Sequence, residues 1–202
     1  IQNMINLPKD DKVMAYINTK DLKDEEYINS HYIVMCTKKG IVKKTSLEQY
    51  SRPRTNGINA ITIREGDQLL EAKMTTGSSQ IMMAVKSGKS IRFEEEKVRS
   101  MGRTAAGVRG IRLADDNDEV IGMICLDNFE SSVLVVSDNG YGKRSAVEDY
   151  RITNRGGKGV KTINITEKTG SLIALKNVTD ADDLMVINKS GITIRIGVDT
   201  LR

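Results

Sequence analysis

Apolar residues recur along the chain in short runs that end near a glycine and resume as an alternating segment. The run at 132–136, Ser-Val-Leu-Val-Val, precedes Gly140, and Lys89-Ser90-Ile91-Arg92-Phe93 alternates directly after Gly88. A short apolar run predicts one β-strand, and alternation at period two predicts another. Glycine suits the turn between them because it accepts positive φ. Each unit therefore begins as a predicted β-hairpin.

The hairpin pattern occurs four times, at intervals of about fifty residues. Its turn glycines are Gly40, Gly88, Gly140 and Gly191, which are 48, 52 and 51 residues apart. Four residues after each glycine stands a base, and these bases are Lys44, Arg92, Arg144 and Arg195. A pattern that returns at this interval indicates one structural unit used repeatedly.

Further strands are predicted in the second half of each unit. A second shared glycine, as in Gly107-Val108, precedes segments that alternate at period two: Ile61-Thr62-Ile63, Ile111-Arg112-Leu113 and Ile163-Asn164-Ile165. A final apolar strand follows, for example at 120–124. A short helical turn is predicted near 94–99, where three glutamates and a lysine interrupt the β pattern.

About four strands per fifty residues is typical of a blade in a propeller-like array. We therefore predict an all-β fold of four-stranded blades with about four blade-equivalents in one domain. The expected repeats are 1–30 (partial, with its tail at 5–17), 31–78, 79–131, 132–182 and 183–202 (partial). Separate α/β units are the alternative, but no long amphipathic stretch supports them. Since the chain starts at Ile1 and both ends cut a repeat, we expect a fragment of a longer protein.

Composition narrows the class of protein. At 39% hydrophobic and 29% charged residues the chain is typical of a globular domain, and no apolar run approaches the ~20 residues of a membrane helix. Cys36 and Cys125 lie in apolar runs, and the chain has one histidine. We therefore expect two buried, reduced thiols and no metal site.

Charge is segregated within each repeat. The stretches 38–54, 86–112, 140–161 and 189–202 hold 23 Lys and Arg against 7 Asp and Glu, while the other 122 residues hold 8 against 20. Equivalent positions of an array fall on equivalent faces, so the basic halves would form one stripe along a curved edge. A solvated surface would explain one such run, but four runs in register favour a polyanion as ligand.

The nature of the polyanion follows from what the chain lacks. It has two Phe, six Tyr and no Trp, whereas single strands are usually held by stacked aromatic side chains. Many Lys and Arg at turns therefore favour double-stranded DNA, held by its phosphates without reading of bases. A protein-binding propeller is the alternative, although such repeats usually carry Trp signatures.

The sequence does not match the phosphate-binding and calcium-binding motifs that it superficially resembles. The pair Gly142-Lys143 lacks the P-loop pattern, because Ser137 replaces the earlier glycine and Arg144 the following Ser or Thr. The carboxylates at 115–119 lack the spacing of a calcium loop. We therefore predict no catalytic residue, no metal ligand and no cofactor in this chain.

Several motifs carry a specific resemblance. The segment 98–113, Val-Arg-Ser-Met-Gly-Arg-Thr-Ala-Ala-Gly-Val-Arg-Gly-Ile-Arg-Leu, and the turns Gly40-Ile41-Val42-Lys43-Lys44-Thr45 and Asn139-Gly140-Tyr141-Gly142-Lys143-Arg144 resemble the C-terminal DNA-wrapping domain of the bacterial gyrase A proteins. The family's seven-residue box, Gln-Arg-Arg-Gly-Gly-Lys-Gly, is not found here. Its nearest counterpart is the degenerate segment 154–159.

The resemblance implies a β-pinwheel, in which neighbouring blades exchange strands and duplex DNA wraps around a basic outer edge. It implies a non-catalytic part of a cytoplasmic, nucleoid-associated bacterial type II topoisomerase that introduces negative supercoils. The implied partners are duplex DNA, the N-terminal part of the gyrase A protein, which holds the nucleophilic tyrosine, and the gyrase B protein in an A2B2 enzyme. ATP and Mg²⁺ would act elsewhere in that enzyme, and no membrane is involved. The related domain of topoisomerase IV is the alternative.

The resemblance also assigns DNA-binding residues. The bases of the hairpin turns are Lys43, Lys44, Arg92, Lys143, Arg144 and Arg195. The bases of the loops are Arg52, Arg54, Arg99, Arg103, Arg109, Arg155 and Lys158.

Overall fold

The computed structural model describes residue 8 and residues 10–127 and 129–201, and it confirms an all-β array. Its strands are β1 (Tyr32–Thr37), β2 (Ile41–Ser46), β3 (Leu69–Thr75), β4 (Gln80–Val85), β5 (Lys89–Glu94), β6 (Val108–Arg109), β7 (Val120–Leu126), β8 (Ser132–Ser137), β9 (Gly142–Ala146), β10 (Val160–Lys161), β11 (Leu172–Val178), β12 (Asp183–Ile187) and β13 (Thr193–Gly197). Its helices are α1 (Glu25–Ser30) and four 3₁₀ helices: η1 (Leu47–Tyr50), η2 (Glu95–Lys97), η3 (Val147–Asp149) and η4 (Val198–Thr200).

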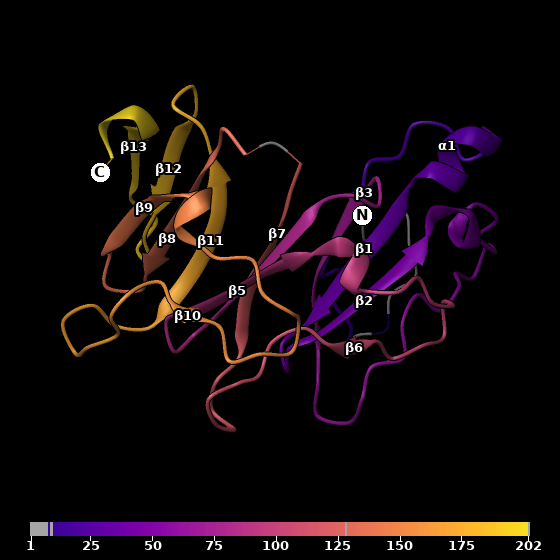
Figure 1. Ribbon diagram of the computed structural model, residues 1–202, viewed down its shortest axis with the longest axis horizontal. Helices are drawn as coiled ribbons and strands as arrows, with labels where there is room; N and C mark the ends of the chain where they lie inside the picture. The colour runs from indigo at the N-terminus through magenta and orange to yellow at the C-terminus, as the bar shows by residue number, and fades with distance from the viewer. Residues whose placement is uncertain (1–7, 9, 128, 202) are drawn as a thin grey trace.

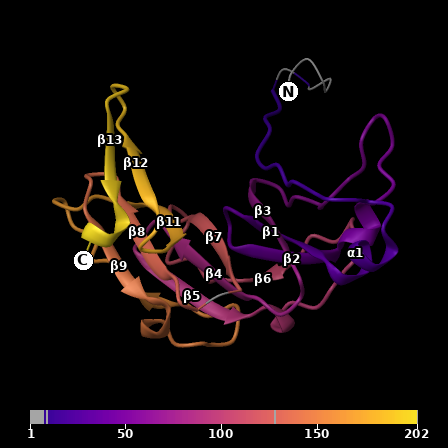
Figure 2. The same ribbon diagram turned by 90° about the horizontal axis from the view of Figure 1, so that it is seen from above.

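Four sheets follow one another in chain order, from right to left in Figures 1 and 2, and we number them as blades one to four. Their strand orders are β3-β1-β2-β6, β10-β5-β4-β7, β11-β8-β9 and β12-β13. Each blade is built on a hairpin, such as β1–β2, in which Val34 lies opposite Lys44. The predicted hairpins are therefore confirmed.

Successive blades exchange strands. The outer strand of blade one is β6, which follows the hairpin of blade two in the sequence and pairs with Ile41 and Val42. In the same way β10 pairs with Lys89 and Ser90 of blade two. The exchange that the resemblance implied is thus present at two places in the chain.

The strands predicted at Ile61–Ile63, Ile111–Leu113 and Ile163–Ile165 are wrong. These segments belong to no strand, and Ile111 and Ile163 lie at bends of the backbone. Instead of the regular hydrogen bonds of a paired strand, the backbone amides of Gly110 and Ile111 both donate to the Gly40 carbonyl, at 2.8 and 3.3 Å. The amides of Thr162 and Ile163 donate to the Gly88 carbonyl in the same way. In the second and third segments, the side chains of Ile111 and Ile165 lie close to the turn glycines Gly40 and Gly88.

A 3₁₀ helix follows each hairpin, so the short helical turn predicted near 94–99 is confirmed at η2. Of the partial repeat expected at 1–30, residues 1–7 and 9 lie outside the described part, and residues 10–23 form no strand. Within the described residues, no helix has the length and apolar character needed to cross a bilayer.

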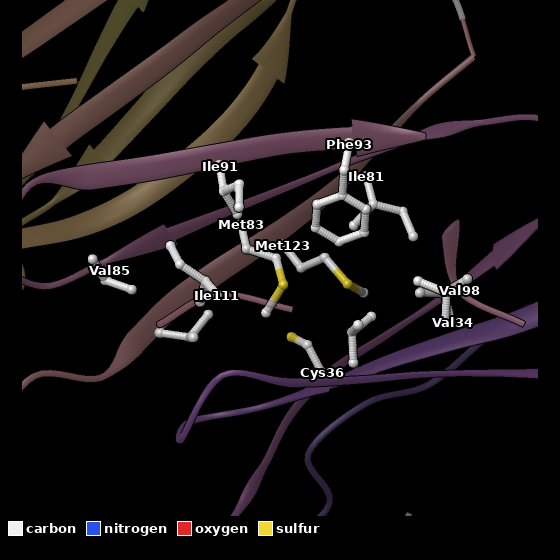
Figure 3. Close-up of a cluster of buried hydrophobic side chains, with 12 residues drawn as sticks. Val34, Cys36, Ile81, Met83, Val85, Ile91, Phe93, Val98, Ile111 and Met123 are labelled. Atoms are coloured by element: carbon white, nitrogen blue, oxygen red, sulfur yellow. The ribbon is translucent and has the colours of Figure 1, made fainter. Parts of the chain in front are cut away.

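The hydrophobic core lies between the blades, because both faces of a central strand are covered. On β4, Ile81, Met83 and Val85 point toward blade one, whereas Met82 and Ala84 point toward blade three. Figure 3 shows the first of these clusters, in which Ile111 lies near Met83 and Val85 and the thiol of Cys36 faces the methionines. Two-sided burial makes every position of β4 buried and hides its period of two.

The turn glycine is needed where blades meet. Gly40 has φ of 84°, and a Cβ there would lie 2.6 Å from the backbone oxygen of Ile111. The turn must therefore lack a side chain both for its conformation and for the close approach of the next repeat.

Candidate nucleic-acid interface

Three long segments, which we call the basic loops, leave the 3₁₀ helices η1, η2 and η3. They span residues 51–68, 98–119 and 150–171, and they run through the lower half of Figure 1. All seven loop bases assigned from the resemblance lie in them. The second and third loops are long because they supply β6 and β10 to the sheet of the preceding blade before returning to their own sheets.

Hydrogen bonds join the basic loops into one surface. The Thr62 hydroxyl donates to the Thr104 carbonyl at 2.6 Å, which ties the first loop to the second. Gly156 donates to Gly110 at 2.5 Å, and Arg112 donates from its backbone to Gly157 at 2.8 Å, which ties the second loop to the third. Bases on different blades are thereby held side by side.

Five of the assigned loop bases are exposed: Arg52, Arg54, Arg99, Arg109 and Lys158. Among residues 10–127 and 129–201, none of these five forms an ion pair with a carboxylate. Unpaired surface cations are the groups that a phosphate backbone neutralises on binding. Their contact with DNA stays a prediction.

Arg103 and Arg155 are half-buried and serve the loops themselves. Arg103 donates from Nη1 to the Asn59 carbonyl at 3.2 Å, and Arg155 donates from Nη1 to the Arg109 carbonyl at 3.1 Å. Each acceptor lies two residues after the loop glycine of the preceding repeat. These two arginines therefore hold neighbouring loops together, with part of each guanidinium left open to solvent.

Lys43 was expected to be an exposed hairpin-turn base, and this is wrong. Its side chain is 0% exposed, and its ammonium donates to the Ala60 carbonyl at 2.5 Å and to the Arg103 carbonyl. Burial, together with the nearby Arg103 charge, lowers the pKa of Lys43 to about 8. Lys43 thus links the first and second basic loops from within.

This burial predicts a pH dependence of stability. Because the pKa of Lys43 is about 8 in the fold against 10.5 ordinarily, the unfolded chain binds more protons between these values. The free energy of unfolding should therefore rise with pH in this window, by up to about 1.4 kcal/mol per pH unit. Urea titrations from pH 7 to 10 measure the free energy of unfolding. It should rise with pH in the native chain and should not show this rise in Lys43→Met. Equal pH profiles of the two proteins would contradict it.

Lys44 and Arg92 are also buried, at 6% and 8% exposure, so their assignment to a DNA-facing edge is wrong. Lys44 lies 3.6 Å from the Glu95 carboxylate and over the Tyr32 ring. Arg92 donates to Gln80 at 2.6 Å and to the carbonyls of Val147 and Tyr150. Burial lowers the pKa of Arg92.

The remaining hairpin-turn bases differ from one another. Lys143 is exposed, at the register position that Lys43 occupies in blade one. Arg144 is half-buried and pairs with Asp180 at 2.5 Å. Arg195 is exposed and pairs with Asp183, which raises the pKa of Arg195. Only Lys143 of this group is therefore both exposed and without an ion pair in the described chain.

Five exposed bases of the basic loops are not among the assigned residues: Arg64, Arg112, Arg151, Lys161 and Lys168. Arg151 stands 52 residues after Arg99, which is the offset between the second and third repeats, so repeat alignment could have found it. Arg112 alternates with the buried Ile111 and was taken for a strand residue. Both belong to the same surface as Arg99 and Lys158.

The carboxylates and thiols have structural surroundings. Asp118 is buried and accepts hydrogen bonds from Ser87 and from the Ala114 backbone, so it fixes the end of the second loop. Cys36 is buried, Cys125 is half-buried, and both are free thiols. Burial raises the pKa of Cys125 to about 12 and that of Cys36 further, which disfavours the reactive thiolates.

Comparison with known proteins agrees with this geometry. The family profile described as DNA gyrase C-terminal domain, beta-propeller, matches residues 31–75, 79–127, 131–179 and 182–202. The DNA gyrase A protein of Staphylococcus epidermidis is 45% identical over 199 residues, which is 98% of this chain and 22% of that protein. The Staphylococcus aureus protein is 42% identical over the same shares. The chain thus spans about a fifth of the length of these relatives.

Solved structures share the fold. The C-terminal domain of DNA topoisomerase IV superposes with a TM-score of 0.89 at 22% identity, covering 99% of this chain and 61% of that one. A DNA gyrase A C-terminal domain superposes with a TM-score of 0.80 at 23% identity, covering 96% and 63%. With matches in all four blades and strand exchange between them, this chain belongs to the DNA gyrase C-terminal domain family.

Proposed function

We propose that the chain binds duplex DNA without sequence preference along its basic loops, as part of a bacterial DNA gyrase. The observation that carries this proposal is that exposed, unpaired bases stand on three successive loops that are hydrogen-bonded to one another. Such a surface offers charge to phosphates over a distance longer than one blade. Cations spread over successive loops suit contacts with phosphates, which carry no sequence information.

A duplex that follows successive loops must bend. Bending costs several kcal/mol over a short site, and contacts with phosphates on consecutive loops offset that cost. In the enzyme, the wrapped duplex would present a second segment to the DNA gate, so that turnover driven by ATP gives negative supercoils. The 45% identity to a gyrase A protein over 98% of this chain favours the gyrase role.

The salt dependence of binding tests the proposal. Affinity for a 20-bp duplex should fall as NaCl rises, with a log–log slope near −0.9 per neutralised phosphate. Replacing two exposed loop bases, Arg99→Gln and Arg109→Gln, should weaken binding and make the slope shallower by about 1.8, as two lost contacts require.

A matched control is Lys176→Gln, because Lys176 is an exposed cation on β11 outside the basic loops. It should leave the slope unchanged. Equal slopes for the native chain and the Arg99/Arg109 variant would overturn the proposed site, and binding that is insensitive to salt would overturn the proposed ligand.

A further inference from the structure

Three of the four bases that lie four residues after the turn glycines make the same hydrogen bond across a seam, where a seam is the contact between two successive blades. In each seam the head group donates to the backbone oxygen of the first residue of the next 3₁₀ helix. The three bonds are Lys44 Nζ to Glu95 (3.3 Å), Arg92 Nη1 to Val147 (2.7 Å) and Arg144 Nη1 to Val198 (3.2 Å). Their acceptors begin η2, η3 and η4.

The backbone of the same residues crosses the first two seams. Met101 donates to the Lys44 carbonyl and Thr153 to the Arg92 carbonyl, both at 2.9 Å. Parallel bridges join Lys44 to Ser100 and Arg92 to Ile152. In Lys44 and in Arg92, the side chain therefore binds the next 3₁₀ helix, and the backbone binds the first residues of the loop that follows that helix.

The side chains at each seam match one another chemically. Where the base is lysine, the helix begins with Glu95, whose buried carboxylate lies 3.6 Å from the Lys44 ammonium and forms an ion pair with it. Where the base is arginine, the helix begins with valine, and the longer, forked guanidinium finds other acceptors instead. Arg92 reaches a second carbonyl at Tyr150, 2.9 Å away.

We propose that Lys44, Arg92 and Arg144 are positioning residues that fix the angle between successive blades and thereby the path of the duplex, without contacting DNA. This inference rests on the proposed function. The link is direct, because η2 and η3 are followed at once by the basic loops that begin at Val98 and Tyr150. A shift of the 3₁₀ helix moves the phosphate-binding loop with it.

A measurement without DNA tests whether these residues fix the angle between successive blades. Spin labels at Glu96→Cys and Asp149→Cys, both exposed on η2 and η3, report the distance between these helices. Arg92→Met should broaden or shift the distance distribution, Arg92→Lys should restore it in part, and the loop variant Arg99→Gln should leave it unchanged. A distribution that is the same in Arg92→Met and the native chain overturns the proposal.

Measurements with DNA separate positioning from contact. On a 12-bp duplex, Arg92→Met should keep its affinity within about two-fold and its salt slope unchanged, whereas Arg99→Gln should make the slope shallower by about 0.9. On a nicked circle that is ligated with bound protein, Arg92→Met should trap less than half of the native linking difference. A shallower 12-bp slope in Arg92→Met would make Arg92 a DNA contact, and an unchanged linking difference would remove its role in the path. Either result overturns the proposal.

Two controls keep these results interpretable. If Arg92→Met fails to fold, Arg144→Met tests the next seam at lower cost, since its partner Asp180 is exposed and solvated; its labels are then placed at Asp149→Cys and Asp199→Cys. If the native chain binds no duplex, the proposed function fails. The distance measurement still decides whether Arg92 or Arg144 fixes the angle between blades.

Discussion

Lys44→Met should destabilise the chain by about 3–5 kcal/mol, because it leaves the Glu95 carboxylate buried without its counter-ion. Glu95 is 0% exposed and retains hydrogen bonds from the Thr75 hydroxyl at 2.8 Å and the Ser79 amide at 3.1 Å. Those two donors are neutral and cannot replace the lysine charge. The free energy of unfolding in guanidinium chloride measures the loss.

The double variant Lys44→Met/Glu95→Gln should be more stable than Lys44→Met alone, since it removes the uncompensated charge and keeps an oxygen for Thr75 or Ser79. Lys86→Met, at an exposed position, should change stability by no more than about 0.5 kcal/mol. A loss below about 1 kcal/mol in Lys44→Met would show that the pair contributes nothing to the seam.

Ile111→Asp should unfold the contact between the first two blades, with a loss above about 4 kcal/mol. Ile111 is 1% exposed and lies in the cluster of Figure 3, while its amide donates to the Gly40 carbonyl. A carboxylate there would have no cation within the cluster. Thermal or denaturant unfolding followed by circular dichroism measures the effect.

Two matched variants show whether burial is the cause. Ile111→Val should cost about 0.5–1.5 kcal/mol, the usual range for one buried methylene. Ile63→Asp, at an exposed isoleucine of the first basic loop, should have little effect. An Ile111→Asp protein as stable as Ile63→Asp would contradict the packing described for this seam.

The sequence predicted the hairpins well because their information is local. A glycine with positive φ and an apolar run on each side suffice to define β1–β2 or β4–β5, and the array follows from the repeat. The exchanged strands β6 and β10 could not be found in this way. Each has two residues, and each pairs with a strand more than sixty residues away.

The errors in the candidate site have one physical cause. Alternation places positions three and four after the turn glycine on opposite faces, and an isolated hairpin would expose one of them. In stacked blades both faces are covered, so Lys43 packs against loop carbonyls while Lys44 and Arg92 enter seams. The apolar sequence of β4 already indicated this packing, because a strand with no polar face is covered by neighbours on both sides.

The exposed bases were predicted more reliably because loops lie on the surface. Arg52, Arg54, Arg99, Arg109 and Lys158 needed no knowledge of blade packing. Knowledge of blade packing would have been needed to predict the hydrogen bonds of Arg103 and Arg155. Their acceptors belong to the loop of the preceding repeat, which no local sequence pattern identifies.

Site-specific crosslinking tests most directly whether the basic loops hold the duplex. A photoreactive side chain would replace Arg99, Arg109 or Lys158, and in separate proteins Lys73 or Lys176 on strands β3 and β11, before irradiation with a 40-bp duplex. We expect crosslinks from all three loop positions, lost at high salt, and none from the two strand positions. Crosslinks from Lys73 or Lys176 with none from the loops would contradict the account.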